Sequence, residues 1–396
     1  MRSVIAWTMT IVICFIAIVT LVPDSLGWLN PHWQLSTHYP WAQALALRGT
    51  MAVGWGLVGL VFIIAAISRV VRHEGGTRTA LIGMVCVLVA AGHTVAIVQR
   101  GVHNVESLGP DTGLSATEFG DGTITVLTLN TENSGADVVK LAITAREQGA
   151  DVLVLPETTQ AYAEKLAELL AQDGYTFQVF SAADELGQSE ESSSPEASTT
   201  MDSDTAGVIA SSTSDAAPAP EPSHDESRVG DDGPAFRVTS VLVSTTVGHY
   251  TQFASPAQLG FGSVYLTSED PTAPVILGIH TYPPLAAFPG RWVKSVTDAT
   301  DLCRQQLPAG LIMAGDFNAT IDHAMMRDLG YCSDAAIEAK IGGLSTWPTT
   351  THTALLGAPI DHIMVDSQAW TVSSGMVIDV DGTDHRALIV RLAPAP

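Results

Sequence analysis

The sequence has few cysteines and few basic residues for its length. Its 396 residues include 4 Cys and 18 Lys and Arg, against 41 Asp and Glu, which gives a formal net charge of −23. It contains no Cys-x-x-Cys pair and no Cys/His spacing typical of a zinc site. A surface this poor in positive charge repels polyanions unless metal ions or a local basic patch intervene. The composition therefore disfavours tight, sequence-independent binding of nucleic acid.

Charged residues of either sign are also scarce, and three long runs contain none. Charged residues make up 15% of the sequence and hydrophobic residues 46%. The runs at 4–22, 49–67 and 79–98 approach the roughly 20 residues that cross a bilayer as a helix. We therefore expect residues 1–100 to form three transmembrane helices. The alternative of a cleaved signal peptide for the first run is disfavoured, because two more runs follow and no small-x-small cleavage site is present. A transporter or receptor is disfavoured because the runs lack Asp, Glu and Lys.

The basic residues between the runs predict the orientation in the membrane. The connection 68–78 contains three arginines and one acid, whereas the first loop, 23–47, contains one acid and no Lys or Arg. Since cytoplasmic loops carry the excess of positive charge, we expect 68–78 in the cytoplasm and everything after Arg100 outside it. The predicted localisation is the cell membrane, with several spans and an extracytoplasmic domain. Aromatic residues that suit a belt at the outer interface are Trp28, Trp33, Tyr39 and Trp41.

The four cysteines divide between the two parts of the chain. Cys14 and Cys86 lie in the apolar runs, where a buried apolar role is the default. Cys303 and Cys332 lie in the outer region, where oxidation is permitted and two thiols can cross-link. The sequence favours a disulfide between Cys303 and Cys332 and a pair of free thiols equally.

After a short polar stalk at 101–121, residues 122–396 alternate between strand and helix patterns. Strand-like runs occur at 124–129, 152–155, 177–180, 239–244, 275–279, 311–314, 360–365 and 388–392, and helical patterns at 136–148, 161–173 and 291–307. This mixture predicts an α/β or α+β layered fold. Residues 181–233 break the pattern, because Ser, Glu, Asp, Ala, Thr and Pro dominate there. Such a segment cannot bury enough apolar surface to offset its chain entropy, so we expect a disordered acidic insert.

Several strand-like runs end in a polar residue that can bind a metal ion or a phosphate. These residues are Asn130, Glu157, His280, Asp316 with Asn318 two positions later, Asp361 with His362, and Asp384 with His385. Adjacent strands of a sheet bring such ends together in space. Carboxylates and amide oxygens without thiolates suit a hard cation, Mg²⁺ or Mn²⁺. Each motif alone is a weak signal, because polar residues at strand ends commonly start loops.

The order and wording of these motifs resemble the endonuclease/exonuclease/phosphatase superfamily, which has the deoxyribonuclease-I-like fold. The similar segments are Leu129-Asn130-Thr131, Pro156-Glu157, His280-Thr281, Gly315-Asp316-Phe317-Asn318-Ala319, Ile360-Asp361-His362-Ile363 and Thr383-Asp384-His385-Arg386. The resemblance covers about 123–392 without the insert. The preceding spans and the sequence His280-Thr281-Tyr282-Pro283-Pro284 indicate the bacterial membrane-anchored branch. The resemblance implies a four-layer sandwich, with two packed β-sheets between layers of helices.

The resemblance also implies which residues bind the metal ion and activate water. Glu157 is expected to be the principal metal ligand, with Asn130 beside it and Asp384 completing the site. Asp316 is expected to orient and deprotonate the attacking water. Asn318 is expected to hold the phosphate or the nucleophile.

A second group of matching residues is expected to contact the substrate. His385 would donate a hydrogen bond to a non-bridging phosphate oxygen. His280, steered by Asp361, would stabilise the pentacovalent state or assist departure of the leaving group. Asn133 and Trp347 are expected to line the substrate cleft, although packing is an equally favoured role for Trp347.

Some residues depart from the family pattern or have no assigned chemistry. Many relatives have an arginine shortly after the fourth strand-like run, where this sequence has Thr245 and Thr246, so one phosphate contact is in doubt. His362 is expected to be structural, and His323 and His352 are expected to lie at the surface.

Together these features predict a membrane-anchored, divalent-metal-dependent phosphoesterase that acts outside the cytoplasm by in-line attack of water. The expected substrate is a phosphate ester of a nucleic acid or a lipid head group, and no protein partner is inferred. Acidity weakly disfavours a nuclease, and the membrane anchor weakly favours a lipid. The alternative is a non-catalytic binding or scaffold module that retains the fold. Loss of metal ligands would favour that alternative, and all the expected ligands are present.

Overall fold

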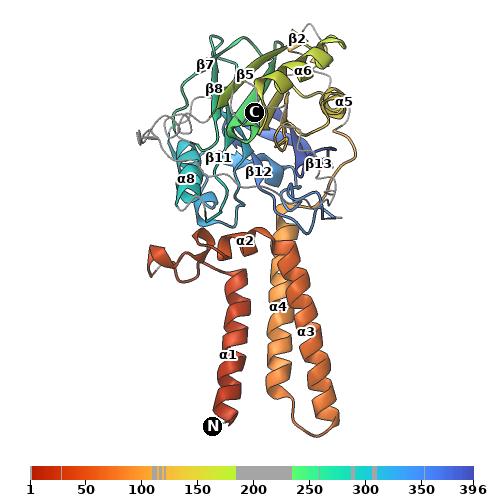
Figure 1. Ribbon diagram of the computed structural model, residues 1–396, viewed down its shortest axis with the longest axis vertical. Helices are drawn as coiled ribbons and strands as arrows, with labels where there is room; N and C mark the ends of the chain where they lie inside the picture. Colours follow the sequence, from red (N-terminus) through yellow and green to blue (C-terminus); the bar gives the residue numbers. More distant parts are fainter. Residues whose placement is uncertain are drawn as a thin grey trace, which may run out of the picture.

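The chain folds into a bundle of long helices joined to a layered domain of strands and helices (Figure 1). The computed structural model describes residues 2–27, 29–108, 114–115, 118–119, 122–183, 234–257, 259–286, 290–305, 310–351 and 353–396. Trp28, His352, part of the predicted stalk and residues 184–233 of the predicted insert lie outside the described residues. Residues 181–183 belong to a strand, so they are not part of an unstructured insert.

Three long apolar helices form the N-terminal part. α1 (Arg2–Leu21), α3 (Arg48–Val71) and α4 (Thr77–Arg100) are each long and apolar enough to cross a membrane. α3 packs along α4, and α1 packs against α4. His93 of α4 lies 3.3 Å from the hydroxyl of Thr20 in α1 and 3.2 Å from the guanidinium group of the first residue of α3. These polar contacts tie the three candidate spans together near the end that meets the layered domain.

Two sheets of six strands make up the layered domain. The first sheet contains, in spatial order, β11 (Cys332–Asp334), β12 (Asp361–Asp366), β10 (Ile312–Asp316), β9 (Ile276–His280), β8 (Ser263–Ser268) and β7 (Tyr250–Phe253). The second contains β13 (Trp370–Asp379), β14 (Arg386–Pro394), β3 (Ile124–Thr128), β4 (Val152–Pro156), β6 (Val238–Ser244) and β5 (Phe177–Ala183). A short separate pair is formed by β1 (Leu114–Ser115) and β2 (Glu118–Phe119). Within the two large sheets, β10 runs parallel to β9 and β3 runs parallel to β4, and the other neighbours are antiparallel.

Helices cover the outer face of each sheet and complete four layers. Side chains alternate along the strands, so that Val126 and Val154 point into the core between the sheets while Leu127 and Leu153 point outward. The outward leucines pack under α5 (Val138–Gln148) and α6 (Gln160–Ala171), and the other sheet packs under α8 (Arg291–Arg304). A further short helix is α9 (Ala335–Glu338). The predicted four-layer sandwich is therefore confirmed.

The sequence around α5 explains why this helix begins and ends where it does. Oδ1 of Asp137 accepts hydrogen bonds from the backbone N–H groups of Val139 and Lys140 at 3.0 and 3.1 Å. These N–H groups have no partner inside the helix, so the aspartate stabilises its first turn. Gly149 follows the last turn in the left-handed conformation that commonly ends helices. The residues before Asp137 therefore lie outside the helix, in a loop that can contribute to the site.

The layered domain rests directly on the helical bundle. Arg48 and Arg100, at the domain-facing ends of α3 and α4, both bind the buried carboxylate of Asp322, at 2.5 Å and at 2.5 and 2.8 Å. Although burial opposes it, the guanidinium groups of Arg100 and Arg48 hold the pKa of Asp322 well below its usual range. A Cβ atom on Gly49 would lie 1.7 Å from the carbonyl oxygen of Leu355, so glycine permits the close approach.

The first loop of the bundle also contacts the domain. It contains two short 3-10 turns and α2 (Trp41–Ala46), which lies across the end of the bundle beneath the domain (Figure 1). The side chain of Asp24 pairs with Arg327 at 2.7 Å. The amide group of Gln43 donates a hydrogen bond to the carbonyl of Pro284. The aromatic residues of this loop were predicted to suit either a belt at the outer interface or, equally well, a small folded loop, and the structure makes the loop part of the contact with the domain.

Cys303 and Cys332 form a disulfide with their Cα atoms 5.3 Å apart. The bond joins the last turn of α8 to the first residue of β11, which is an edge strand of the first sheet. Cys14 and Cys86, in the apolar helices, are free.

Candidate active site

The register of three neighbouring strands brings several predicted site residues together. Asp316, the last residue of β10, pairs with His280 at the end of β9 and with Asp361 at the start of β12. Because β9 is parallel to β10 and β12 is antiparallel to it, these three positions fall at one edge of the first sheet.

The second sheet contributes its residues at the same edge. Asn130 and Glu157 follow the parallel strands β3 and β4, and Asp384 and His385 precede the antiparallel strand β14. The amide nitrogen of Asn130 lies 3.1 Å from Glu157 Oε1 and 3.1 Å from Asp316 Oδ2. One side chain thus bridges the carboxylates of the two sheets.

Two histidines and three carboxylates surround a common point. His280 Nε2 lies 3.9 Å from Glu157 Oε1 and 3.8 Å from Asp316 Oδ2. His385 Nε2 lies 3.9 Å from Asp316 Oδ2 and 3.8 Å from Asp384 Oδ1. These separations are longer than hydrogen bonds. The side chains therefore face one another without pairing directly.

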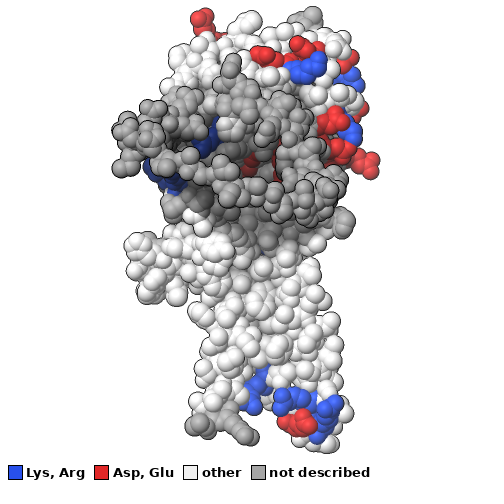
Figure 2. Space-filling model, in the orientation of Figure 1, with Lys and Arg blue, Asp and Glu red and all other residues white. Residues whose placement is uncertain are grey.

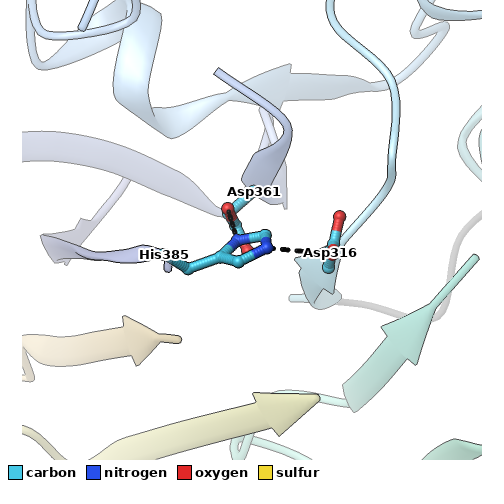
Figure 3. A group of neighbouring side chains, drawn as sticks. All are labelled: Asp316, Asp361 and His385. Carbon is cyan, nitrogen blue, oxygen red and sulfur yellow. Dashed lines mark hydrogen bonds and ion pairs between the residues drawn. The ribbon is translucent and has the colours of Figure 1, made fainter. Parts of the chain in front are cut away.

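The two histidines differ in their charge state. His385 Nδ1 lies 2.9 Å from Asp361 Oδ2, and its other ring nitrogen faces Asp316 (Figure 3). Although burial acts to lower it, the carboxylates of Asp361, Asp316 and Asp384 raise the pKa of His385 to about 10. Burial and the charge of His385 lower the pKa of His280 to about 3. At neutral pH the site therefore contains one cationic and one neutral imidazole.

Burial favours the protonated forms of two of the carboxylates, those of Asp316 and Glu157. Burial, followed by the charge of Asp361, raises the pKa of Asp316 to about 7. Burial likewise raises the pKa of Glu157. No Lys or Arg side chain lies among the described residues that line this site. Crowded, buried carboxylates without thiolates fit a hard divalent cation.

Two groupings of side chains have the chemistry of a metal site. Asp316, Asp361 and His385 offer ligand atoms that all lie within 4.8 Å of one another. Asp361 and His385 are hydrogen-bonded to each other, however, which engages one oxygen and one nitrogen of that trio. Glu157 and Asp384, which form the second grouping, are not hydrogen-bonded to each other. The amide oxygen of Asn130 accepts a hydrogen bond from the backbone N–H of residue 132 at 2.9 Å, so its amide nitrogen faces the carboxylates.

The remaining predicted residues lie at the margin of the cluster. Asn318 donates its backbone N–H to Asp316 Oδ1 at 2.7 Å. Trp347 donates its indole N–H to Asp384 Oδ2 at 2.7 Å, so it positions a carboxylate as well as lining the cavity. Asn133 contacts the site through its backbone N–H, which lies 3.1 Å from a carboxylate oxygen of the residue after β4. The side chain of Asn133 is not among those that line the cavity.

The backbone at the site is locally strained. Glu157 has φ 57° and Asn318 has φ 46°, and the loop 132–134 has φ between 49° and 61°. These five residues account for most of the described non-glycine residues with positive φ, which number seven. Residues other than glycine rarely adopt this conformation, and they do so mainly at functional sites.

The cluster opens into a cavity of about 520 Å³. Its lining includes residues that the sequence had not indicated, namely Glu132, Phe236, Phe261, Gln43, Ala46 and Leu47. Glu132 Oε2 accepts the backbone N–H of Asp384 at 2.8 Å. Glu132 lies two residues after Asn130. This position was a usable signal, because it adds another acid to the strand ends that carry the predicted site residues. No local signal marks the residues from the first loop of the bundle.

The other histidines divide into a structural residue and a correction. The ring nitrogens of His362 lie 2.8 Å from Asp334 Oδ2 and 2.9 Å from the carbonyl of Ala319, which agrees with the predicted structural role. The prediction that His323 lies at the surface was wrong. His323 is 1% exposed and its Nε2 lies 3.0 Å from the carbonyl of Ala42, because the first loop of the bundle covers it.

Comparisons with known proteins give one family and a set of similar structures. A model described as "Endonuclease/Exonuclease/phosphatase family" matches residues 127–385. The endonuclease/exonuclease/phosphatase from Beutenbergia cavernae is 16% identical, with 69% of this chain and 72% of that chain covered and a TM-score of 0.43. D. rerio TDP2 complexed with single strand DNA product is 14% identical, with 69% and 99% covered and a TM-score of 0.45. The human Nocturnin catalytic domain with bound sulfate anion is 14% identical, with 69% and 94% covered and a TM-score of 0.39. No curated protein matched the sequence.

Proposed function

This chain belongs to the endonuclease/exonuclease/phosphatase family, and we propose that it is a membrane-anchored phosphoesterase that requires a divalent metal ion, Mg²⁺ or Mn²⁺. Members of this family are typically hydrolases of phosphate esters. The observation that carries the proposal is the cluster in which the carboxylates of Glu157, Asp316 and Asp384 face His280 and His385 at 3.8 to 3.9 Å.

Glu157 and Asp384 would hold the metal ion, with Asn130 beside them. Burial raises the pKa of Glu157, so a cation next to it would relieve the cost of its charge. When bound, a divalent cation neutralises negative charge that develops on the oxygens at phosphorus. Trp347 would fix the direction of Asp384 through its indole N–H.

Asp316 would accept the proton of the attacking water. It receives hydrogen bonds from the backbone N–H of Asn318 and from the amide of Asn130, which leave its carboxylate in one orientation. A pKa of about 7 suits a general base at neutral pH, since the group is partly ionised and still basic.

The two histidines, which both face Asp316, would act on the phosphate. His385 is protonated and its Nε2–H is free to donate to a non-bridging oxygen, because Asp361 engages its Nδ1. His280 is neutral and can donate one N–H toward the leaving oxygen. Asp361, which was expected to steer His280, is instead hydrogen-bonded to His385, so it would act as a positioning residue for His385.

The proposed side of action is extracytoplasmic. The basic side chains of the bundle that are visible in Figure 2 gather at the end opposite the domain. That end contains the loop between α3 and α4, with Arg69, Arg72 and Arg78 in or beside it. Positive charge in short loops favours the cytoplasm, which would leave the domain outside.

The test uses the full-length protein purified in detergent, with bis-p-nitrophenyl phosphate as substrate. We expect turnover that requires Mg²⁺ or Mn²⁺ and stops in EDTA. Asp316→Asn should lower kcat by about 10² to 10⁴, the usual contribution of a general base. Asp328→Asn is the matched control, because the Asp328 side chain is 79% exposed and lies outside the cavity.

Three results would count against the proposal. Turnover that persists in EDTA would show that no metal ion is required. An Asp316→Asn variant as active as Asp328→Asn would show that Asp316 is not the general base. A folded protein that binds phosphate esters without hydrolysing them would favour the non-catalytic module.

A further inference from the structure

The active-site cavity lies where the helical bundle meets the layered domain. Gln43, Ala46 and Leu47 line it together with the catalytic cluster. Leu47 directly precedes α3, a candidate span that begins at Arg48. A segment that enters a membrane span lies at the level of the lipid head groups. Gln43 and Ala46 belong to α2, which lies beneath the domain (Figure 1), so the cavity would lie at the depth of lipid phosphates.

The walls of the cavity have two different characters. The catalytic carboxylates and histidines form one part of the lining. Apolar side chains, among them Leu47, Phe236, Phe261, Pro283 and Leu285, form another. Leu285 is 55% exposed, so part of its apolar surface is available to a ligand. A cavity of this kind matches a ligand that has a phosphate at one end and hydrocarbon at the other.

The charge around the cavity does not match a nucleic acid. No Lys or Arg occurs among the described residues that line it. The two arginines nearest the bundle contact, Arg48 and Arg100, are both bound to Asp322. Proteins bind nucleic acids largely by neutralising successive phosphates with Lys and Arg. The cavity can neutralise one phosphate with a metal ion, but it offers nothing for its neighbours.

The first loop of the bundle, whose last residues line the cavity, also exposes apolar side chains. Leu26, Leu29, Trp33 and Tyr39 are 44%, 54%, 49% and 72% exposed. Trp and Tyr are enriched where a protein meets the surface of a bilayer. The loop that borders the cavity is therefore suited to contact with lipid.

We propose that the substrate is a phosphate ester carried by a membrane lipid, taken from the leaflet next to the domain. The phosphate lies at the carboxylate cluster and the adjoining hydrocarbon lies along Leu47 and Leu285. A cavity of about 520 Å³ takes the head-group region only, so the chains stay in the bilayer. Water adds its oxygen to phosphorus and the P–O ester bond breaks. One proton of the water passes to Asp316, and the leaving oxygen accepts a hydrogen bond from His280 and takes its proton from bulk water. This inference rests on the proposed function and specifies its substrate.

The experiment uses the full-length protein in phosphatidylcholine vesicles. The substrates are dioleoyl phosphatidic acid, dioleoyl phosphatidylglycerol, bis-p-nitrophenyl phosphate and a single-stranded DNA oligonucleotide. We expect hydrolysis of a long-chain ester with a kcat/KM well above that for the oligonucleotide. The two lipids distinguish a phosphomonoester from a phosphodiester source.

Variants of the apolar wall test the placement of the hydrocarbon. Leu285→Glu and Leu47→Gln should raise KM for the lipid at least tenfold more than KM for bis-p-nitrophenyl phosphate. Val139→Glu is the matched control, because Val139 is a 52% exposed apolar residue on α5, outside the cavity. It should alter neither ratio.

The outcomes separate this inference from the proposed function. Hydrolysis of bis-p-nitrophenyl phosphate or DNA with no hydrolysis of either lipid would overturn the lipid substrate and leave the phosphoesterase intact. Equal effects of Leu285→Glu on lipid and soluble ester would overturn the apolar wall. Failure to hydrolyse any of the four esters would overturn both proposals.

Discussion

Two buried aspartate–histidine pairs lie in the described part of the layered domain. They differ in what the second ring nitrogen of each histidine contacts. Asp361 and His385 are 2.9 Å apart, and Asp334 and His362 are 2.8 Å apart. The second ring nitrogen of His362 is engaged by a backbone carbonyl at 2.9 Å, whereas that of His385 faces Asp316 at 3.9 Å. The same pair of residues is thus structural in one place and available to a substrate in the other.

This difference gives a prediction for the pH dependence of activity. The Asp361 carboxylate helps to raise the pKa of His385 to about 10, so His385 is protonated below that pH. Asp361→Asn removes the charge, and burial then lowers the pKa. We expect the alkaline limb of the kcat/KM profile, measured with Mg²⁺, to move down by about 1–3 pH units. Asp334→Asn is the matched control and should leave that limb in place. An unchanged limb in Asp361→Asn would show that His385 does not act as the cationic donor.

A second prediction concerns the residue that positions Asp384. Trp347→Phe keeps the ring but removes the indole N–H that donates to Asp384 Oδ2 at 2.7 Å. Residues that orient metal ligands typically contribute about 10–100-fold to metal affinity or activity. We expect a shift of that size in the Mg²⁺ concentration needed for half-maximal rate. Trp370→Phe is the control, since Trp370 donates at 3.0 Å to a backbone carbonyl in the core. Equal metal requirements in the two variants would contradict the positioning role.

At the scale of elements, the strands that the sequence indicated and those it missed differ in burial. Each strand-like run overlaps an observed strand, and β3, β4, β9 and β10 are buried along their whole length. The missed strands β7, β11 and β13 are at sheet edges, and β8 is next to one. β13 has exposed positions and a register shift between Val372 and Ser374, so it has neither an apolar run nor strict alternation.

The same reasoning explains which parts of the site were predictable. Asp316 ends a buried strand and Glu157 directly follows another, so the sheets fix their positions and the sequence indicates them. Gln43 and Leu47 reach the cavity only because the bundle docks on the domain. That contact joins segments far apart in the sequence, and no local pattern of residues specifies it.

The docking itself depends on a buried carboxylate. Asp322→Asn would leave Arg48 and Arg100 without the charge that they both bind at 2.5 Å. Breaking a buried ion pair by removing one partner costs about 3–5 kcal/mol. We expect a clearly lower thermal midpoint for the full-length protein in detergent. Asp173→Asn, which breaks an exposed pair with Arg146, should cost about 0–1 kcal/mol. Similar midpoints for the two variants would mean that the ionic contact does not hold the parts together.

At the scale of the whole molecule, charge and disulfide chemistry favour the same orientation. The basic side chains of the bundle that Figure 2 shows gather at the end away from the domain, whereas Arg48 and Arg100 at the other end are bound to Asp322. The disulfide between Cys303 and Cys332 lies in the domain, and such bonds persist mainly outside the cytoplasm. These two independent features favour the proposed extracytoplasmic side for the domain.

Labelling of single cysteines in intact cells would test this orientation. Glu74→Cys lies in the loop between α3 and α4, and Glu168→Cys lies on α6, where the side chain is 67% exposed. A membrane-impermeant maleimide should label Glu168→Cys in intact cells and Glu74→Cys only after permeabilisation, because positive charge retains the loop in the cytoplasm. The native cysteines add little background, since Cys86 is buried and Cys14 is partly buried in an apolar helix. The reverse labelling pattern would place the domain in the cytoplasm, and the lipid substrate would then come from the inner leaflet.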